Sequence, residues 1–170
     1  MEVMEAIQKR RSVRKFTGAP VSCEDLVQIV NAGRLAASGN NRQPWEFIII
    51  TDPAIMSRLR IPADHWSEKA GAYIAVVMDP ESRWWIEDGA AAVQNMLLAS
   101  FALGYGACWI EGYTLRNEAL LKQVLGIPEN RRLFTLVPIG VPAEIPTKEK
   151  KSLEEVLHWQ QYTPRAPAIE

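Results

Sequence analysis

The sequence has little of several features that define common protein classes. It contains two cysteines and two histidines among 170 residues, and its formal net charge at neutral pH is -1. Two cysteines, Cys23 and Cys108, are too few for a disulfide framework. A net charge near zero argues against a dedicated nucleic-acid-binding protein. Because His65 and His158 lie far apart without a partner at ligand spacing, no histidine-based metal site is expected.

Long hydrophobic runs are also missing. No apolar stretch approaches the roughly 20 residues that cross a membrane, and Glu2 and Glu5 stand where a secretory signal would be apolar. No Gly-x-Gly-x-x-Gly pattern follows a predicted strand, so a Rossmann nicotinamide site is not indicated. We therefore expect a cytoplasmic protein that contacts neither membrane nor nucleic acid. The length is typical of one domain, here residues 1–170 with an extended tail from about residue 160.

The hydrophobic pattern that is present predicts both strands and helices. Apolar runs bounded by turn residues predict strands at residues 45–50, 72–78, 107–110 and 132–140. Helical spacing predicts helices at residues 3–11, 24–37, 54–60, 84–103, 115–125 and 152–159. Ser22 followed by Asp25, and Ser152 followed by Glu155, are typical of helix starts. No repeat or linker divides the pattern.

The predicted helix at residues 84–103 has an unusual composition. It is rich in alanine, methionine and leucine, and it carries no charge after Asp88. A helix that is apolar all round is buried on every side. In a domain of this size, we expect a second subunit to cover part of it, and a central core helix is the alternative.

A basic run near the start of the chain predicts an anion site. Five cations and Ser12 lie within residues 9–15. Arginine forks together with a small hydroxyl suit a phosphate monoester, because each guanidinium presents paired donors to its oxygens. The alternative is a solvated basic turn, since a basic helix C-terminus also suits the helix dipole.

A second polar segment joins a predicted helix to a predicted strand. Asn40, Asn41 and Gln43 each carry a side-chain amide that can donate and accept hydrogen bonds. Such groups suit a ring edge with mixed donors and acceptors, such as a pyrimidine or a flavin. The alternative is a simple turn, because glycine and asparagine favour turn conformations.

Four segments in order resemble one known family. They are Arg-Arg-Ser-Val-Arg at residues 10–14, Ser-Gly-Asn-Asn-Arg-Gln-Pro-Trp at 38–45, Gly-Tyr-Gly-Ala-Cys-Trp-Ile-Glu-Gly at 104–112, and Pro-Ile-Gly-Val-Pro at 138–142 followed by Lys-Glu-Lys at 148–150. Over most of residues 3–157 the chain is similar to the nitroreductase family of FMN-dependent oxidoreductases. The resemblance implies an α+β fold, with a mixed β-sheet flanked by helices and a long central helix that forms a homodimer. FMN would lie at the subunit interface.

The resemblance also implies which residues bind FMN. Contacts to the ribityl phosphate fall on Arg10, Arg11, Ser12, Arg14, Lys148 and Lys150. Contacts to the flavin ring, partly from the partner subunit, fall on Ser38, Gly39, Asn41 and Gln43. Glu111 and Gly112 match the positions whose backbone lies beside the reactive N5 edge. Ala37 stands where the family commonly has proline, and Lys150 where it commonly has arginine.

The implied activity is transfer of a hydride from NAD(P)H through the flavin to a small electron-poor acceptor, such as a nitroaromatic or a quinone. Because the flavin carries this chemistry, no catalytic side chain is assigned. One alternative is a specialised flavin enzyme of the same fold, a dehalogenase or a flavin-destroying synthase. Such relatives usually carry lid segments, and residues 52–72 leave little material for one. Another is a non-enzymatic FMN-binding electron carrier or store, and a third is a scaffold dimer without flavin.

Four further residues fit either a packing role or a role in the site. Trp84 and Trp85 either pack or line the substrate pocket, because flat rings stack on flat substrates. His65 follows the first predicted strand, in a loop that either lines a cleft or lies on the surface. Cys108 sits in an apolar segment and is interpreted as a core residue.

Overall fold

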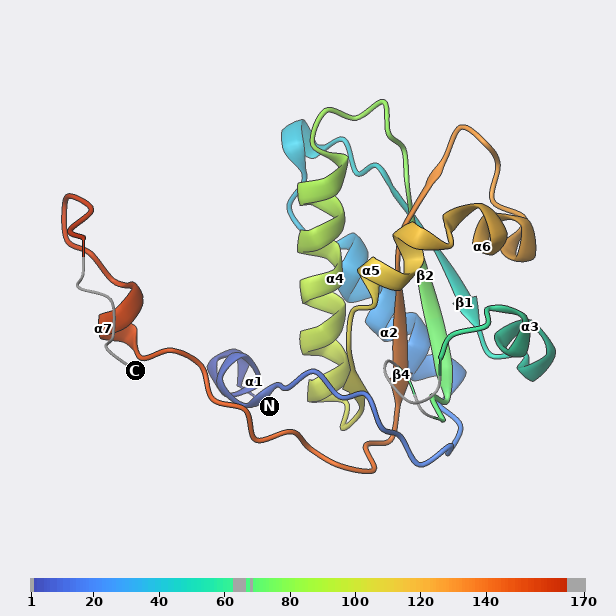
Figure 1. Cartoon of the computed structure of the whole chain (residues 1–170), viewed down its shortest axis with the longest axis horizontal. Helices are drawn as coiled ribbons and strands as arrows, with labels where there is room; N and C mark the ends of the chain where they lie inside the picture. Colours follow the sequence, from blue (N-terminus) through green and yellow to red (C-terminus); the bar gives the residue numbers. More distant parts are fainter. Residues whose placement is uncertain (1, 63–66, 68, 165–170) are drawn as a thin grey trace.

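The computed structural model describes residues 2–62, 67 and 69–164. Its strands form one sheet in the order β1-β2-β4-β3 (Figure 1). The strands are β1 (Trp45–Ile50), β2 (Ala72–Met78), β3 (Gly106–Ala107) and β4 (Arg132–Gly140). These strands pair antiparallel, whereas the resemblance implied a mixed sheet. Parallel pairing enters only as a bridge between Ser12 and Ala107, within the part of the chain that is described.

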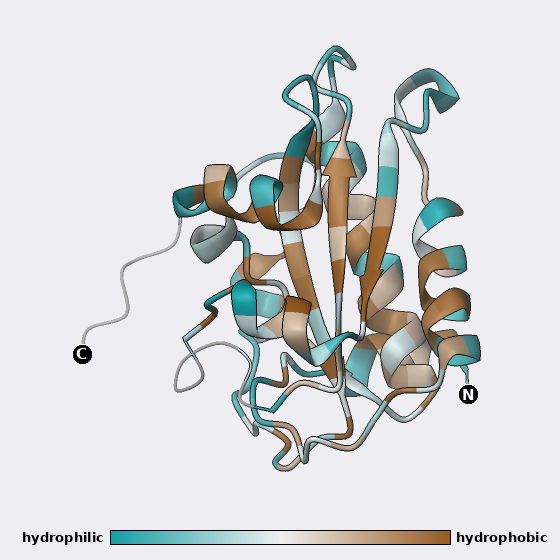
Figure 2. Ribbon diagram, turned by 90° about the vertical axis from the view of Figure 1, so that its right-hand side faces the viewer, coloured by the Kyte–Doolittle hydropathy of each residue, from teal (hydrophilic) through white to brown (hydrophobic). Residues whose placement is uncertain are grey.

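Helices cover both faces of this sheet. They are α1 (Val3–Lys9), α2 (Cys23–Arg34), η1 (Gly39–Asn41, a 3-10 turn), α3 (Pro53–Arg58), α4 (Trp85–Ala102), α5 (Glu111–Arg116), α6 (Glu118–Leu125) and α7 (Leu153–Val156). Residues of α2 and α4 pack in one core cluster, and residues of α5 and α6 pack in the other. The result is an α+β domain with a hydrophobic layer on each side of the strands (Figure 2).

Strand β2 explains why two core layers form. All seven of its side chains are buried. Ala72, Ile74, Val76 and Met78 join the layer under α2 and α4, while Tyr73, Ala75 and Val77 join the layer under α5 and α6. Successive side chains of a strand point to opposite faces, so a continuously apolar strand fits only where both faces are covered.

The long helix α4 is covered on one side only in a single chain. Ala92, Val93 and Met96 are fully buried in the core layer. Ile86, however, is 53% exposed, and Gln94 is exposed as well. One chain alone therefore does not cover α4 on every side, which disagrees with the alternative of a central core helix and leaves a face for the second subunit that the sequence analysis expects. No helix in the described part of the chain is long and apolar enough to cross a membrane.

Two predicted helix starts are confirmed by their hydrogen bonds. The side chain of Ser22 accepts the N–H of Asp25 at 3.0 Å at the start of α2. Ser152 and Glu155 form a reciprocal capping box at the start of α7. Local side-chain chemistry of this kind is visible in sequence because both partners lie within one turn.

Other boundaries differ from the prediction. The predicted helix at residues 115–125 is two helices, α5 and α6, which meet at Asn117. Helix α5 forms because it packs on β4, where the Leu136 N–H donates to Thr114 Oγ1 at 3.2 Å. The predicted strand at residues 107–110 is reduced to β3, and α2 ends at Arg34 instead of residue 37.

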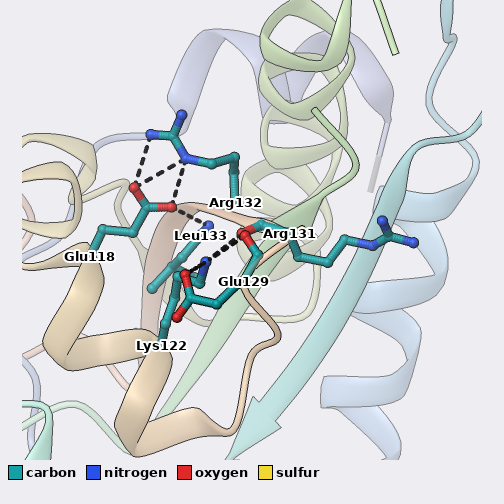
Figure 3. Close-up of polar contacts among 6 residues, drawn as sticks. All are labelled: Glu118, Lys122, Glu129, Arg131, Arg132 and Leu133. Carbon is teal, nitrogen blue, oxygen red and sulfur yellow. Dashed lines mark hydrogen bonds and ion pairs between the residues drawn. The ribbon is translucent and has the colours of Figure 1, made fainter. Parts of the chain in front are cut away.

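Helix α6 holds the first residues of β4 through charged groups (Figure 3). Glu118 accepts three hydrogen bonds from Arg132, two from Nε at 2.8 and 3.1 Å and one from Nη2 at 2.9 Å. It accepts a fourth from the Leu133 N–H at 2.9 Å. Lys122 is buried and donates to the carbonyls of Glu129 and Arg131 at 3.1 and 2.8 Å. Because Glu118 and Lys122 lie one turn apart, one helix face fixes both the strand and the loop before it.

We expect Glu118→Gln to lower the free energy of unfolding by about 1–3 kcal/mol, because a neutral amide weakens charge-assisted bonds to Arg132. Burial acts to raise the pKa of Glu118, but the bonds from Arg132 and Leu133 outweigh it and leave the pKa below 4.5. Because the pKa of Glu118 is lower in the folded than in the unfolded chain, its ionised form stabilises the fold at pH values above the unfolded-state pKa. This stabilisation is lost as the pH falls through the folded-state pKa. Urea unfolding at pH values from 7 to 3 measures the free energy of unfolding of both proteins. If the wild type and Glu118→Gln lose stability equally as the pH falls, the prediction is wrong.

The two cysteines should differ sharply in reactivity. Cys108 is buried, and burial raises the pKa of its thiol to about 12, although Arg14 acts slightly to lower it. Cys23 is exposed. Since the thiolate is the nucleophile, a chromogenic thiol reagent at pH 8 should label one cysteine in the folded chain and both in urea. Cys23→Ser should abolish the labelling of the folded protein; labelling of Cys108 there would show that it is accessible.

Candidate functional site

The basic run is held between two other parts of the chain. On one side, the Val13 N–H donates to the Ala107 carbonyl at 3.1 Å. On the other, the Thr17 N–H donates to the Val141 carbonyl at 2.9 Å, and the Ala143 N–H donates to the Lys15 carbonyl at 2.9 Å. Antiparallel pairing at residues 15–17 places the residues before Lys15 beside the residues after Ala143. Segments far apart in sequence therefore meet at this point.

Close approach at β3 depends on a glycine. A β-carbon at Gly106 would lie 2.7 Å from the side chain of Val13. Val13 is buried, so it has no room to move aside. Only glycine lets the basic run pair with β3 at this distance.

The predicted phosphate residues lie together around one hollow of about 390 Å³. Its lining consists of Arg10, Arg11, Ser12, Arg14, Pro146, Lys148, Glu149 and Lys150. All six residues assigned to the phosphate by resemblance are among them, although the two groups lie more than 130 residues apart in sequence. Five cationic residues and one acidic residue, Glu149, therefore line the same hollow, a composition that suits an anion.

Arg10 is the least solvated cation of this hollow. Its Nη1 is buried and has no hydrogen-bond partner among the described residues. Burial, followed by the neighbouring charge of Arg11, lowers the pKa of Arg10. An unpaired cation out of water is costly, so this arrangement favours a bound anion. Arg11 is partly committed elsewhere, because its Nη1 donates to the carbonyls of Gln8 and Arg10 at 2.8 and 3.0 Å.

The amide loop at residues 38–43 has a strained backbone. Asn40, Asn41 and Gln43 all have positive φ, between 50° and 55°, a region that costs energy for residues other than glycine. Internal bonds hold it: Ser38 Oγ accepts the Gln43 N–H at 3.1 Å, and Gln43 Nε2 donates to the Asn41 carbonyl at 3.3 Å. The side chain of Asn41 is exposed and makes no such bond within the loop, so its amide is presented to the surface.

The first turn of α4 anchors this loop. Asp88 Oδ1 accepts the Gly39 N–H at 2.9 Å. A β-carbon at Gly39 would overlap the ring of Trp84, on which Arg83 stacks 5.5 Å from the centroid. Trp84 thus supports the loop. Asp88 was not predicted as a site residue; its place as the last charge of an apolar helix was the available signal.

Trp85 has a packing role. Its ring meets Phe134 edge-on, with centroids 6.2 Å apart, and Arg132 lies 5.5 Å above it. His65, the other candidate for the substrate pocket, lies outside the described residues. His158 accepts the Thr163 N–H at 3.1 Å. The described part of the chain holds no group of three or more residues suited to a metal ion.

The positions predicted beside N5 follow β3 closely in the chain. Glu111 follows Ala107 by four residues, a distance of at most about 14 Å along an extended chain. Helix α5, which begins with Glu111 and Gly112, is tied down by Tyr113, whose hydroxyl lies 2.8 and 2.7 Å from the carbonyls of Leu59 and Arg60. Gly112 is exposed, so its backbone is accessible.

The amide loop and the basic hollow lie at opposite ends of α4 (Figure 1). Asp88, in its first turn, bonds the loop. Phe101, in its last turn, lines a smaller hollow together with Arg10 and Arg11. Between these two positions the helix rises about 20 Å, at about 1.5 Å per residue. One chain therefore does not bring the two predicted halves of the site together.

Comparison with known proteins identifies the family. The nitroreductase family model matches residues 7–69 and 61–141. An Archaeoglobus fulgidus protein, named as a candidate NADH dehydrogenase/NAD(P)H nitroreductase, is 36% identical over 84% of this chain and 87% of its own length. A Bacteroides fragilis nitroreductase solved with bound FMN superposes with a TM-score of 0.76 at 28% identity, covering 95% of this chain and 100% of that one. An iodotyrosine deiodinase of Haliscomenobacter hydrossis is 24% identical over 92% and 87% of the two chains. The chain belongs to the nitroreductase family.

Proposed function

We propose that this protein is an FMN-dependent oxidoreductase that passes a hydride from NAD(P)H to a small electron-poor acceptor. The observation that carries the proposal is the basic hollow, which is lined by cationic residues from both ends of the domain. One of them, Arg10, has a buried Nη1 with no hydrogen-bond partner among the described residues. A flavin monophosphate supplies the dianion that such a cluster requires. The relatives whose names include NAD(P)H or FMN support the same assignment.

Each part of the chain would have a separate task. Arg10, Ser12, Arg14 and the two lysines of the closing segment would bind the phosphate. The amides of Asn41 and Gln43 would contact the edge of the ring, and the backbone at Glu111 and Gly112 would lie beside N5. The bound flavin itself accepts and donates the hydride. The chain needs no side-chain acid or base for this and contributes binding, orientation and exclusion of water.

A homodimer explains the separation of the two halves. If a second copy packs against the uncovered face of α4, the amide loop of one copy can reach the phosphate hollow of the other. The segment after β4 supports this arrangement, because it leaves the domain as an arm (Figure 1) and exposes Trp159 and Tyr162 by 77% and 78%. Large exposed apolar side chains mark an interaction surface.

Two alternatives are less well supported. The first is a specialised flavin enzyme such as a dehalogenase. The alignment with the iodotyrosine deiodinase runs over 196 residues, although this chain has 170, so the deiodinase contains segments that this chain lacks. A non-enzymatic FMN carrier would bind flavin but would not be reduced by NADH or NADPH. Rapid mixing with each nicotinamide under anaerobic conditions separates an enzyme from a carrier. We place the protein in the cytoplasm, in keeping with a cysteine content too low for a disulfide framework.

Arg10→Ala should weaken FMN binding by about 10- to 100-fold, because it removes a charge-assisted contact from a poorly solvated position. Fluorescence titration of the flavin-free protein measures this, and the loss should be larger at low salt, where the charge contributes most. Lys9→Ala is a matched control, since Lys9 pairs with Glu5 at 2.8 Å outside the hollow. Equal affinities for wild type and Arg10→Ala would remove Arg10 from the site.

A mixed dimer tests whether two chains share each site. Arg10→Ala and Asn41→Ala are placed in separate chains carrying different tags, and the heterodimer is purified. If each cleft combines the phosphate hollow of one copy with the loop of the other, one cleft carries both changes and the second carries neither. The heterodimer should then bind one FMN with wild-type affinity. If the heterodimer has no site that binds FMN with wild-type affinity, both halves of the site act within one chain.

A further inference from the structure

Asp88 is a buried carboxylate in the first turn of α4, and its acidic neighbour Glu87 is exposed. Asp88 is 4% exposed, and its Oδ1 accepts the Gly39 N–H at 2.9 Å. Its Oδ2 is buried and has no hydrogen-bond partner among the described residues. After Asp88, helix α4 contains no further charged residue. A charge at this place is costly for folding, so packing alone does not account for it.

The hydrogen bond from the Gly39 N–H links Asp88 to the amide loop. Gly39 is the residue at which the loop touches α4, with the ring of Trp84 against its α-carbon. The strained residues Asn40, Asn41 and Gln43 follow directly. A backbone in that region persists only where its surroundings hold it. The carboxylate and the ring fix the start of the loop from two directions, and this fixes where the following amides are presented.

We propose that Asp88 is a positioning residue for the flavin ring: through the Gly39 N–H it sets the orientation of the Asn41 and Gln43 amides. The inference rests on the proposed function, because it assumes that these amides contact the ring. Asp88 touches neither cofactor nor substrate. Its effect should be confined to the ring, because the side chains that it would position, Asn41 and Gln43, are assigned to the ring and not to the phosphate.

This confinement gives a test that uses two ligands. Riboflavin carries the same ring as FMN but lacks the phosphate. A residue that positions the ring contacts should change the affinity for both ligands by the same factor. A residue of the phosphate hollow should change the affinity for FMN alone, and Arg10→Ala provides that reference.

The flavin-free full-length protein is titrated with FMN and with riboflavin by fluorescence. For Asp88→Ala we expect the two affinities to fall equally, by about tenfold, since one hydrogen bond to a charged group is lost. Asp88→Asn keeps an oxygen for the Gly39 N–H and should lose only about two- to fivefold, again equally. Asp25→Asn is the matched control. It removes the same charge from a carboxylate that accepts the Tyr105 hydroxyl at 2.7 Å, and it should bind both ligands as the wild type does.

Thermal melting followed by circular dichroism shows whether each variant is folded. If Asp88→Ala does not fold, the equal loss expected for Asp88→Asn decides the question. Wild-type affinities in the folded Asp88 variants, or a loss for FMN alone, would overturn the positioning role. A wild-type protein that binds neither flavin would instead overturn the proposed function, which keeps the two failures distinct.

Discussion

The arrangement of this site depends on a few backbone hydrogen bonds that hold the basic run in place. The run lies between β3 and the segment after β4, fixed by the Val13 bond to Ala107 and by the pairing of residues 15–17 with residues 141–143. Like charges brought this close repel one another. The pairing overcomes that repulsion because it is set by backbone groups and by the burial of Val13 and Phe16, which do not depend on the charges. Backbone pairing and apolar burial thus hold several cations close together at one surface, where the electrostatic potential is positive.

Helix α4 separates the two functions that the site must combine. Its last turn lies near the cations, and its first turn holds the amide loop through Asp88. A rigid helix keeps these groups about 20 Å apart within one chain. In the proposed dimer the same separation becomes useful, because two antiparallel copies bring unlike ends together. Binding the phosphate and orienting the ring are then carried by different subunits.

Much of the fold and of the site could be predicted from the sequence. Strand β2 was readable because seven consecutive apolar residues require cover on both faces, and both helix caps were readable because they are local. The six phosphate residues were predicted by resemblance and lie around one hollow. Helix α5 was missed because its stability comes from Thr114 and β4, a contact between residues distant in sequence. Asp88 was missed for the same reason: its partner Gly39 lies 49 positions away.

If each cleft is shared, cofactor binding and assembly are thermodynamically linked. A ligand that binds only the assembled state stabilises that state by mass action. Arg10 and its neighbours would then favour the dimer only when the flavin ring also reaches the partner's loop, and a phosphate without a ring would not. The strained loop adds to this effect, since its conformation is maintained in the free chain by Asp88 and Trp84 and need not be formed on binding. The unfavourable free energy of the positive-φ backbone and of the buried carboxylate is part of folding. It therefore does not reduce the affinity of the folded protein for the ring.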